Sequence, residues 1–505
     1  MKLSAAISLF LLLPFSASSQ DASIDTLTII HWNDVHAQNA PFSITSRTGN
    51  HEKYNVGGMM TLAVHVKELR AASKNPLVLD GGDEFQGTPI SNITHGRSQI
   101  DLVNGIMPDA MVIGNHEFDY TADTLREVLR AAKFPILCAN VFDLTTGTTF
   151  APPYIIKTVG RMKIAIVGIT APGLMRLTMK SNLSSVSVLN RDSTLSYLFD
   201  KIKNEEHPTL IVLVSHEGID ADSALAEKFS EINVIVAAHD HRALQEPKKI
   251  NHTIIVEAGS KGQYLGKLDL VVDLKDRSVK SYMGKLIEMR SDDVRIDWTM
   301  EDKVDMYERI VNDALKEVIG TLEKPLDRET KDSPECNLGD FETDAFRSVT
   351  AYPAAVAFVN TSGLRKNLEG PQITLRDIWE VNPFGNALVY FTVRGDTLMN
   401  MMEWQASRPS LQVSGLKYTI DKSKMAGQMV ASLQLGGKPL DSTAQYSVIT
   451  NEFIGDHFDE YFGFKPPPGL LLNTGIIDRD AVIDFVKQKK DISEEIEGRI
   501  RVLSK

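Results

Sequence analysis

Residues 110–119 read Ala-Met-Val-Ile-Gly-Asn-His-Glu-Phe-Asp, an apolar run that gives way abruptly to polar side chains. A short apolar run of this kind favours a buried strand, and the glycine that ends it favours a turn. Asn115, His116 and Asp119 follow at once. In layered α/β folds, ligands bind at the carboxyl ends of the strands. The stretch therefore predicts a strand that leads into a functional loop.

The same pattern, an apolar run followed by potential ligand residues, recurs between residues 27 and 241. Helical patterns separate several of these runs, and in Thr121–Lys133 the apolar residues recur at helical spacing. A further strand is predicted at Ile164–Ile169. This alternation of strands and helices predicts an α/β layered domain. The recurrences are Asp34 and His36 after Leu27–His31, Asp83 after Leu77–Asp80, His216 after Leu210–Val214, and His239 and His241 after Val234–Ala238.

The rest of the chain divides into a connecting segment and a second domain. Residues 300–322 carry an apolar stripe that includes Val304, Val311 and Val318, which predicts a helix that links two domains. We therefore expect a first domain over residues 25–298, a linker helix over 299–323 and a second domain over 324–505.

The first twenty residues have the three parts of a secretory signal peptide. Lys2 is followed by an apolar run to Leu13 and then by small residues, Ser16–Ser19. The apolar run is shorter than the roughly 20 residues that a membrane-spanning helix needs. We expect residues 1–19 to be removed and the mature chain to be exported to the periplasm or the extracellular space, with no integral membrane segment.

Composition excludes some classes of function. Lys and Arg total 54 against 66 Asp and Glu, so the formal net charge is -12. A protein that binds nucleic-acid polymers draws much of its affinity from cations that neutralise phosphates, which argues against that class. Cys138 and Cys336 are too few for a disulfide scaffold, and we expect unpaired thiols because they fall in different domains. The sequence does not indicate an oligomeric state.

The ligand residues suit two divalent metal ions. Asp34, His36 and His241 could hold one ion, and Asn115, His216 and His239 a second, with the Asp83 carboxylate bridging both. Mixed nitrogen and oxygen donors favour zinc, manganese, iron or cobalt over calcium, which prefers oxygen alone. Two such ions supply local positive charge that lets an acidic protein bind an anionic substrate.

These motifs resemble the calcineurin-like metallophosphoesterases. More narrowly, they resemble the exported two-domain 5'-nucleotidase family, which includes bacterial UDP-sugar hydrolases and animal ecto-5'-nucleotidases. The resemblance runs from "HWNDVHAQ" (residues 31–38) to "HDHR" (residues 239–242). It implies a four-layer metallophosphoesterase domain, in which two β-sheets pack together between helices, followed by a smaller α+β substrate-recognition domain.

The resemblance also implies an activity, the removal of phosphate from nucleotides by direct attack of a metal-activated water. His116 would stabilise charge on the phosphoryl group in the transition state, and Asp119 would orient that imidazole. In the second domain, "VNTSGLRKN" (residues 359–367) and "VNPFGNALVYFTVRGDTL" (residues 381–398) match family segments. By that match Asn360 and Arg365 would bind the substrate, with Arg365 on the phosphate, and Phe384 and Tyr461 would stack on the base.

Three departures from the family pattern leave other substrates open. Pro334 stands where the family commonly has a phosphate-binding Arg, and Thr361 and Ser362 replace glycines. "GDHFDEYF" (residues 455–462) replaces the family's "GGDGF". The alternatives are a 2',3'-cyclic nucleotide phosphodiesterase, a nucleotide-sugar pyrophosphatase and a thiosulfohydrolase-like sulfur-ester hydrolase. A non-catalytic nucleotide-binding protein is a further alternative.

Overall fold

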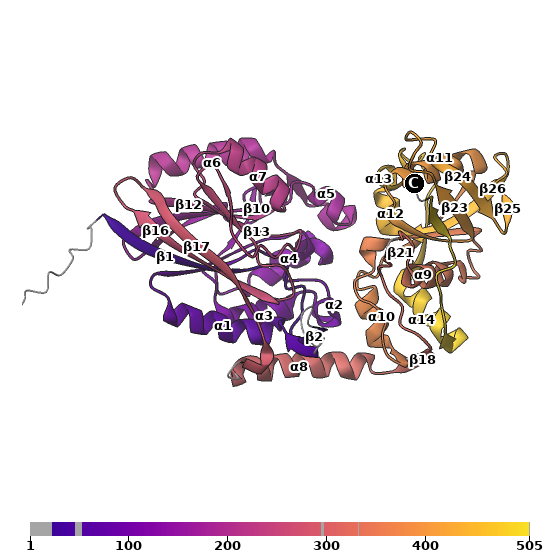
Figure 1. Ribbon diagram of the computed structural model, residues 1–505, viewed down its shortest axis with the longest axis horizontal. Helices are drawn as coiled ribbons and strands as arrows, with labels where there is room; N and C mark the ends of the chain where they lie inside the picture. Colours follow the sequence, from indigo (N-terminus) through magenta and orange to yellow (C-terminus); the bar gives the residue numbers. More distant parts are fainter. Residues whose placement is uncertain (1–22, 46–52, 294–296, 332, 504–505) are drawn as a thin grey trace, which may run out of the picture.

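The computed structural model describes residues 23–45, 53–293, 297–331 and 333–503. Two α/β domains lie side by side, and helix α8 (Trp298–Leu315) runs along one side of both (Figure 1). The predicted signal peptide, residues 1–19, lies outside the described residues. Within the described ranges, no helix is long and apolar enough to cross a membrane.

Two six-stranded sheets form the centre of the first domain, and the predicted strands are β1, β4, β5, β10, β12 and β13. In each sheet four neighbouring strands run parallel, so their carboxyl ends meet at one edge. The first sheet has the order β17 (Ser278–Glu288), β16 (Tyr264–Asp273), β1 (Ile24–Trp32), β4 (Pro76–Asp80), β5 (Ala110–Val112) and β6 (Ile136–Leu137). The second has the order β14 (Lys248–Ile250), β15 (Thr253–Val256), β13 (Val234–Ala237), β12 (Leu210–His216), β10 (Met162–Thr170) and β9 (Tyr154–Val159).

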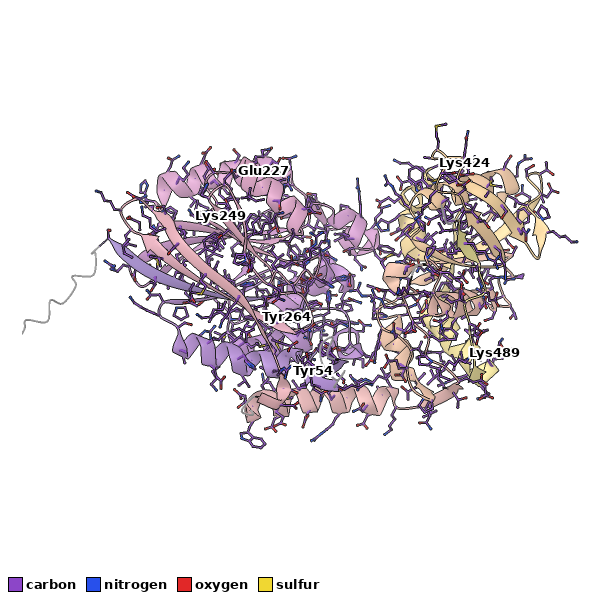
Figure 2. The ribbon with its side chains drawn as sticks, viewed as in Figure 1. Tyr54, Glu227, Lys249, Tyr264, Lys424 and Lys489 are labelled. Atoms are coloured by element: carbon purple, nitrogen blue, oxygen red, sulfur yellow. The ribbon has the colours of Figure 1, made fainter. Side chains whose placement is uncertain are left out.

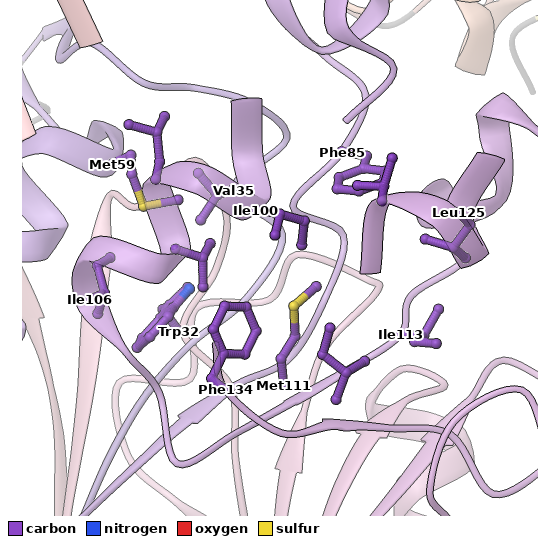
Figure 3. Close-up of a cluster of buried hydrophobic side chains, with 14 of the residues drawn as sticks. Trp32, Val35, Met59, Phe85, Ile100, Ile106, Met111, Ile113, Leu125 and Phe134 are labelled. Carbon is purple, nitrogen blue, oxygen red and sulfur yellow. The ribbon is translucent and has the colours of Figure 1, made fainter. Parts of the chain in front are cut away.

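Both faces of these sheets are buried, as the apolar runs of the sequence require. Successive side chains of a strand point to opposite faces. In β1, Leu27 and Ile29 join an apolar cluster that includes side chains of β12, so they pack between the two sheets. Ile30 and Trp32 join a different cluster, on the helical side of the first sheet (Figure 3).

Helices cover the outer face of each sheet. Helices α1 (Gly58–Ala72), α3 (Arg97–Ile106) and α4 (Ala122–Leu129) pack on the first sheet. Helices α6 (Arg191–Glu205) and α7 (Ile219–Lys228) pack on the second (Figure 1). The layers are helix, sheet, sheet and helix, which confirms the predicted four-layer fold.

The largest sheet of the second domain is five-stranded and mixed, and it lies between two apolar clusters. Helices α9 (Asn337–Arg347) and α14 (Asp478–Lys489) contribute to one cluster, and α11 (Gly395–Ser407) and α13 (Phe458–Phe462) to the other. The strand order is β22 (Leu411–Ser414), β19 (Val356–Asn360), β26 (Gln445–Asn451), β21 (Ala387–Arg394) and β27 (Leu472–Ile477). This mixture of strands and helices confirms the predicted α+β character.

The connecting segment differs from the prediction. The helix predicted over residues 300–322 ends at Leu315, and Val318–Leu322 forms strand β18. This strand pairs with β20 (Gln372–Thr374) and β28 (Asp491–Ile492) of the second domain. A Cβ added at Gly320 would lie 2.7 Å from the Lys490 carbonyl oxygen, so the close pairing needs glycine there. The β-branched residues and this glycine favour a strand over a longer helix.

Many charged side chains lie at the surface, away from the buried acids of the core. Glu227 on α7, Lys424 and Lys489 are exposed on the outer faces of the two domains (Figure 2). Cys138 and Cys336 are buried and unpaired, as predicted.

Candidate metal and substrate site

The predicted ligand residues all lie at the carboxyl ends of parallel strands. His216 is the last residue of β12, and the others lie in the loops after β1, β4, β5 and β13, so the two sheets aim them at one edge of the first domain. Several of them adopt the left-handed backbone conformation, which is uncommon for residues other than glycine and often marks functional sites. These are Asp34 (φ 54°), His36 (52°), Asp83 (55°), His239 (89°) and His241 (58°).

One group of ligand atoms belongs to Asp34, His36 and His241. The Nε2 atoms of His36 and His241 lie 3.0 Å apart. Asp34 Oδ1 lies 3.5 Å from His241 Nε2 and 3.9 Å from His36 Nε2. Two imidazole nitrogens that face each other at this distance repel unless a proton or a cation lies between them, and the carboxylate adds the negative charge that a cation requires.

A second group belongs to Asp83, His216 and His239, whose ligand atoms also lie within 4.8 Å of one another. Asp83 Oδ2 lies 3.0 Å from His216 Nε2 and 4.0 Å from His36 Nε2 of the first group. The Asp83 carboxylate therefore lies between the two groups. Asn115 follows β5 and lines the same cavity as Asp83 and His239.

Hydrogen bonds within the protein orient the donor atoms of both groups for binding a cation. The second nitrogen of His216, Nδ1, lies 2.7 Å from the Gly81 carbonyl oxygen, and that of His36 lies 3.3 Å from the Phe85 carbonyl oxygen. Each Nδ1–H donates to its carbonyl, which leaves the Nε2 lone pair for a metal. Asn115 Oδ1 is buried and accepts no hydrogen bond within the described residues. The residues present therefore fit divalent transition-metal ions.

Electrostatics reflect this concentration of imidazoles and carboxylates. Burial lowers the pKa of His36 well below its usual value, and it also lowers the pKa of His239. Burial acts against a charged His216, but the Asp83 and Asp34 carboxylates outweigh it and raise the pKa of His216 to about 10. Asp83 shows the reciprocal effect, because His216 and its neighbours hold the pKa of this buried carboxyl well below the usual value. The centre thus favours ionised carboxylates.

Glu117, which the sequence reasoning did not select, organises the loops that carry the ligands. One of its carboxylate oxygens accepts hydrogen bonds from the backbone N–H groups of Glu84 (2.8 Å) and Phe85 (3.1 Å), and the other from those of Asp83 (3.0 Å) and Gly114 (2.7 Å). The loops after β4 and β5 are thereby joined. The signal was its place in "GNHE", directly after the catalytic candidate His116.

His116 and Asp119 form a close pair beside these groups. His116 Nδ1 donates to Asp119 Oδ2 over 2.7 Å, and the His116 backbone N–H donates to Asp83 Oδ1 over 2.9 Å. Burial disfavours a charged imidazole, but the Asp119 and Asp83 carboxylates outweigh it and raise the pKa of His116. The free Nε2–H of a protonated His116 is then available to an anionic group in the cavity.

The second domain closes the cavity from the other side. The cavity has a volume of about 240 Å³, and both domains line it. Asn360, Arg365 and Phe384, the candidate substrate-binding residues, line it from the second domain. Arg365 Nη2 donates to Gln86 Oε1 of the first domain over 3.3 Å.

Tyr461 does not line this cavity, whereas another aromatic residue of the second domain does. Phe453, a residue of α12 (Glu452–Asp456) that belongs to no motif we singled out, lines the cavity together with Phe384. Tyr461 packs edge-on against Phe453, with ring centroids 6.4 Å apart, and lines an adjacent cavity. Pro334 accepts a hydrogen bond from Gln412 through its carbonyl oxygen (2.8 Å), which is a structural contact.

Family models match both domains. The model for calcineurin-like phosphoesterases matches residues 27–243, and the model for the 5'-nucleotidase C-terminal domain matches residues 318–465. The first match includes all the candidate metal ligands, and the second includes Asn360, Arg365 and Phe384.

Relatives and solved structures match the chain over nearly its whole length. An apyrase of Tabanus yao is 28% identical over 94% of each chain. A snake venom 5'-nucleotidase of Crotalus adamanteus is 27% identical over 96% of this chain and 90% of its own. The crystal structure of a 5'-nucleotidase precursor from Thermus thermophilus is 29% identical, with a TM-score of 0.85 over 95% of this chain and 100% of its own. A sulfate thiohydrolase from Thermus thermophilus shares the fold, at 20% identity and a TM-score of 0.78 over 95% of this chain and 97% of its own.

Fold, site and comparisons agree on one assignment. The chain belongs to the two-domain 5'-nucleotidase family of the calcineurin-like phosphoesterases, which are hydrolases of phosphoester bonds.

Proposed function

We propose that this protein is an exported nucleotide phosphohydrolase that uses two divalent metal ions. One observation carries the proposal. Metal-type donors and the His116–Asp119 pair come from one domain, and Arg365 with the Phe384 and Phe453 rings comes from the other, across a single cavity. Charged groups for a phosphate and flat rings for a base are what a nucleotide requires.

The ligand groups divide between the two ions. Asp34, His36 and His241 would hold one ion, and Asn115, His216 and His239 the other. Asp83 would bind both, because its carboxylate lies between the groups. When bound, two divalent cations supply Lewis acidity and lower the pKa of a bound water toward neutrality.

The residues of the chain orient the substrate and stabilise its charge. His116 donates its Nε2–H to a phosphoryl oxygen, and Asp119 holds the imidazole in that orientation through Nδ1. Arg365 adds a planar pair of donors from the second domain. Phe384 and Phe453 stack on the base, and Asn360 lines the same cavity.

The proposal gives each part of the chain a separate role. We assign metal binding and chemistry to residues 25–298, the connection to α8 and β18 within residues 299–323, and substrate recognition to residues 324–505. Export rests on the signal-peptide pattern of residues 1–19. Relatives named snake venom 5'-nucleotidases support the same interpretation.

A panel of substrates tests the proposal. The purified protein would be assayed with Mn²⁺, Zn²⁺ or Co²⁺ on AMP, UDP-glucose, 2',3'-cyclic AMP and a thiosulfonate. We expect the highest kcat/KM for AMP, with release of inorganic phosphate. Alanine in place of His116 or His239 should remove that activity while the far-UV circular dichroism stays unchanged. A preference for any other substrate, or full activity in both variants, would contradict the proposal.

A further inference from the structure

A buried acid of the second domain, Glu342, lines the proposed substrate cavity. Glu342 lies in the middle of helix α9 with a fully buried side chain. Neither of its carboxylate oxygens has a hydrogen-bond partner among the described residues, yet the residue lines the cavity that holds Phe384 and Phe453. A buried polar group without a partner destabilises the fold, so each such group calls for an explanation.

The position of Glu342 is not explained by the packing of α9. Phe341 and Ala345, on either side of it in the sequence, pack into the apolar cluster of the domain. Thr343, the next residue, is also buried, but its hydroxyl donates to the carbonyl oxygens of Gly339 (2.8 Å) and Asp340 (3.1 Å) within the helix. The hydrogen bonds of Thr343 are therefore made within helix α9. The carboxyl group of Glu342 has no such bond, so it is available to a ligand in the cavity.

The surroundings of Glu342 favour the uncharged form of its carboxyl group. Burial raises the pKa of Glu342 well above its usual value, and the Asp478 carboxyl adds to the effect. A neutral carboxyl offers one O–H donor next to one acceptor oxygen, and either oxygen can carry the proton.

The cavity around Glu342 has the character of a base-binding pocket. Phe384 and Phe453 offer flat apolar faces, and side-chain amides can meet polar edges in the plane of a stacked ring. The amides of the second domain that line the cavity belong to Asn360, Asn382, Asn386 and Asn451. A donor beside an acceptor matches the edge formed by N1 and the 6-substituent of a purine, whether that substituent is an amino or an oxo group. A pyrimidine carries its corresponding edge closer to the sugar, so it reaches less far into the pocket.

We propose that Glu342 recognises the N1 and 6-substituent edge of a purine base and makes the protein selective for purine nucleotides. This inference rests on the proposed function, because it names the base that the nucleotide site takes. Glu342 acts as a specificity residue, since it contacts the base and not the reacting phosphate.

Substrate pairs that differ only at this edge test the proposal. For each protein, kcat/KM would be measured on AMP, on purine riboside 5'-monophosphate, which lacks the 6-amino group, on UMP and on ribose 5-phosphate. In the parent protein we expect AMP to exceed purine riboside 5'-monophosphate by about tenfold, the effect of one buried hydrogen bond. In Glu342→Leu this ratio should fall to about one, and the preference for AMP over UMP should fall with it.

Two further variants separate recognition from a general disturbance of α9. Glu342→Gln keeps a donor beside an acceptor. It should therefore retain most of the preference for AMP over purine riboside 5'-monophosphate that Glu342→Leu loses. Thr343→Val removes a neighbouring buried hydroxyl that does not line the cavity, and its ratios should match the parent. Thermal unfolding of Glu342→Leu should occur at or above the parent temperature, because a buried acid without a partner is removed.

The outcomes distinguish this proposal from the proposed function. Three results would overturn the role of Glu342. They are an unchanged preference of Glu342→Leu for AMP over purine riboside 5'-monophosphate, an equal loss of that preference in Thr343→Val, and a sharp fall in the unfolding temperature of Glu342→Leu. Failure of the parent protein to hydrolyse any of the nucleotides would overturn the proposed function itself.

Discussion

The rings of His116 and Phe384 lie 6.1 Å apart, centroid to centroid, at an angle of 33°, although the two residues belong to different domains. His116 follows β5 of the first domain, and Phe384 precedes β21 of the second. The Arg365 guanidinium lies 5.8 Å from the centre of the Phe384 ring and donates to Gln86 of the first domain. The residues that we propose to bind the phosphate and the base therefore meet where the two domains face each other.

Phe384→Ala should weaken nucleotide binding without removing the chemistry. Loss of a stacking ring costs about 1–3 kcal/mol, so KM for AMP should rise roughly 5- to 150-fold. Hydrolysis of p-nitrophenyl phosphate, which has no nucleobase, should change much less. Steady-state kinetics on both substrates measure the difference, and an equal loss on both would contradict a role for Phe384 in base stacking.

Asp119→Asn should lower kcat and change its dependence on pH. The Asp119 carboxylate helps to raise the pKa of His116, and activity that needs protonated His116 is lost as the pH rises through that pKa. Removal of the negative charge lowers the pKa of His116, so the alkaline limb of the kcat profile should move to lower pH. We also expect kcat at its optimum to fall about 10²-fold or more. An unchanged alkaline limb would show that His116 is not the group that titrates.

Asp83→Asn should reduce both metal content and activity. The carboxylate lies between the two ligand groups, and an amide carries no negative charge to hold two cations. We expect kcat to fall about 10³-fold or more, with less metal bound after dialysis, as measured by inductively coupled plasma mass spectrometry. Asp313→Asn, at an exposed position on α8, is the matched control and should behave as the parent. Full metal content in Asp83→Asn would contradict the bridging role.

Glu117→Leu should destabilise the domain and loosen the metal site. Four buried backbone N–H groups of the loops after β4 and β5 lose their acceptor, and each unsatisfied donor costs about 1–3 kcal/mol. The free energy of unfolding in urea should therefore fall by several kcal/mol. Glu117→Gln keeps one acceptor oxygen and should lose less. Equal stability of the two variants would mean that the carboxylate does not hold these loops.

Strand positions and ligand candidates could be predicted from the sequence because both are local patterns. An apolar run that is buried on both faces, such as β12, has to end where the chain leaves the core, and His216 is its last residue. Polar residues at that point are visible without any knowledge of the partner strand. The prediction of a linker helix was wrong beyond Leu315 for the opposite reason, because strand β18 forms by pairing with β20 and β28, which lie far along the chain.

The second aromatic of the pocket was missed because no local pattern marks it. Phe453 and Tyr461 are both aromatic and eight positions apart, and which of them lines the cavity depends on how α12 and α13 pack on the sheet. Glu342 likewise looks like an ordinary helical residue in the sequence. That its carboxyl group is buried without a hydrogen-bond partner among the described residues is visible only in the folded domain.

The sequence by itself determined the chemistry of this protein: which side chains can bind metal ions, which pair can hold a proton, and that an α/β domain carries them. The tertiary structure decided which of these atoms meet. His36 and His241 are 205 positions apart, and their Nε2 atoms lie 3.0 Å from each other because two sheets pack face to face. Arg365 reaches Gln86 across 279 positions because the second domain covers the strand ends of the first. Contacts of this range depend on the packing of whole layers and domains, which local residue patterns do not encode.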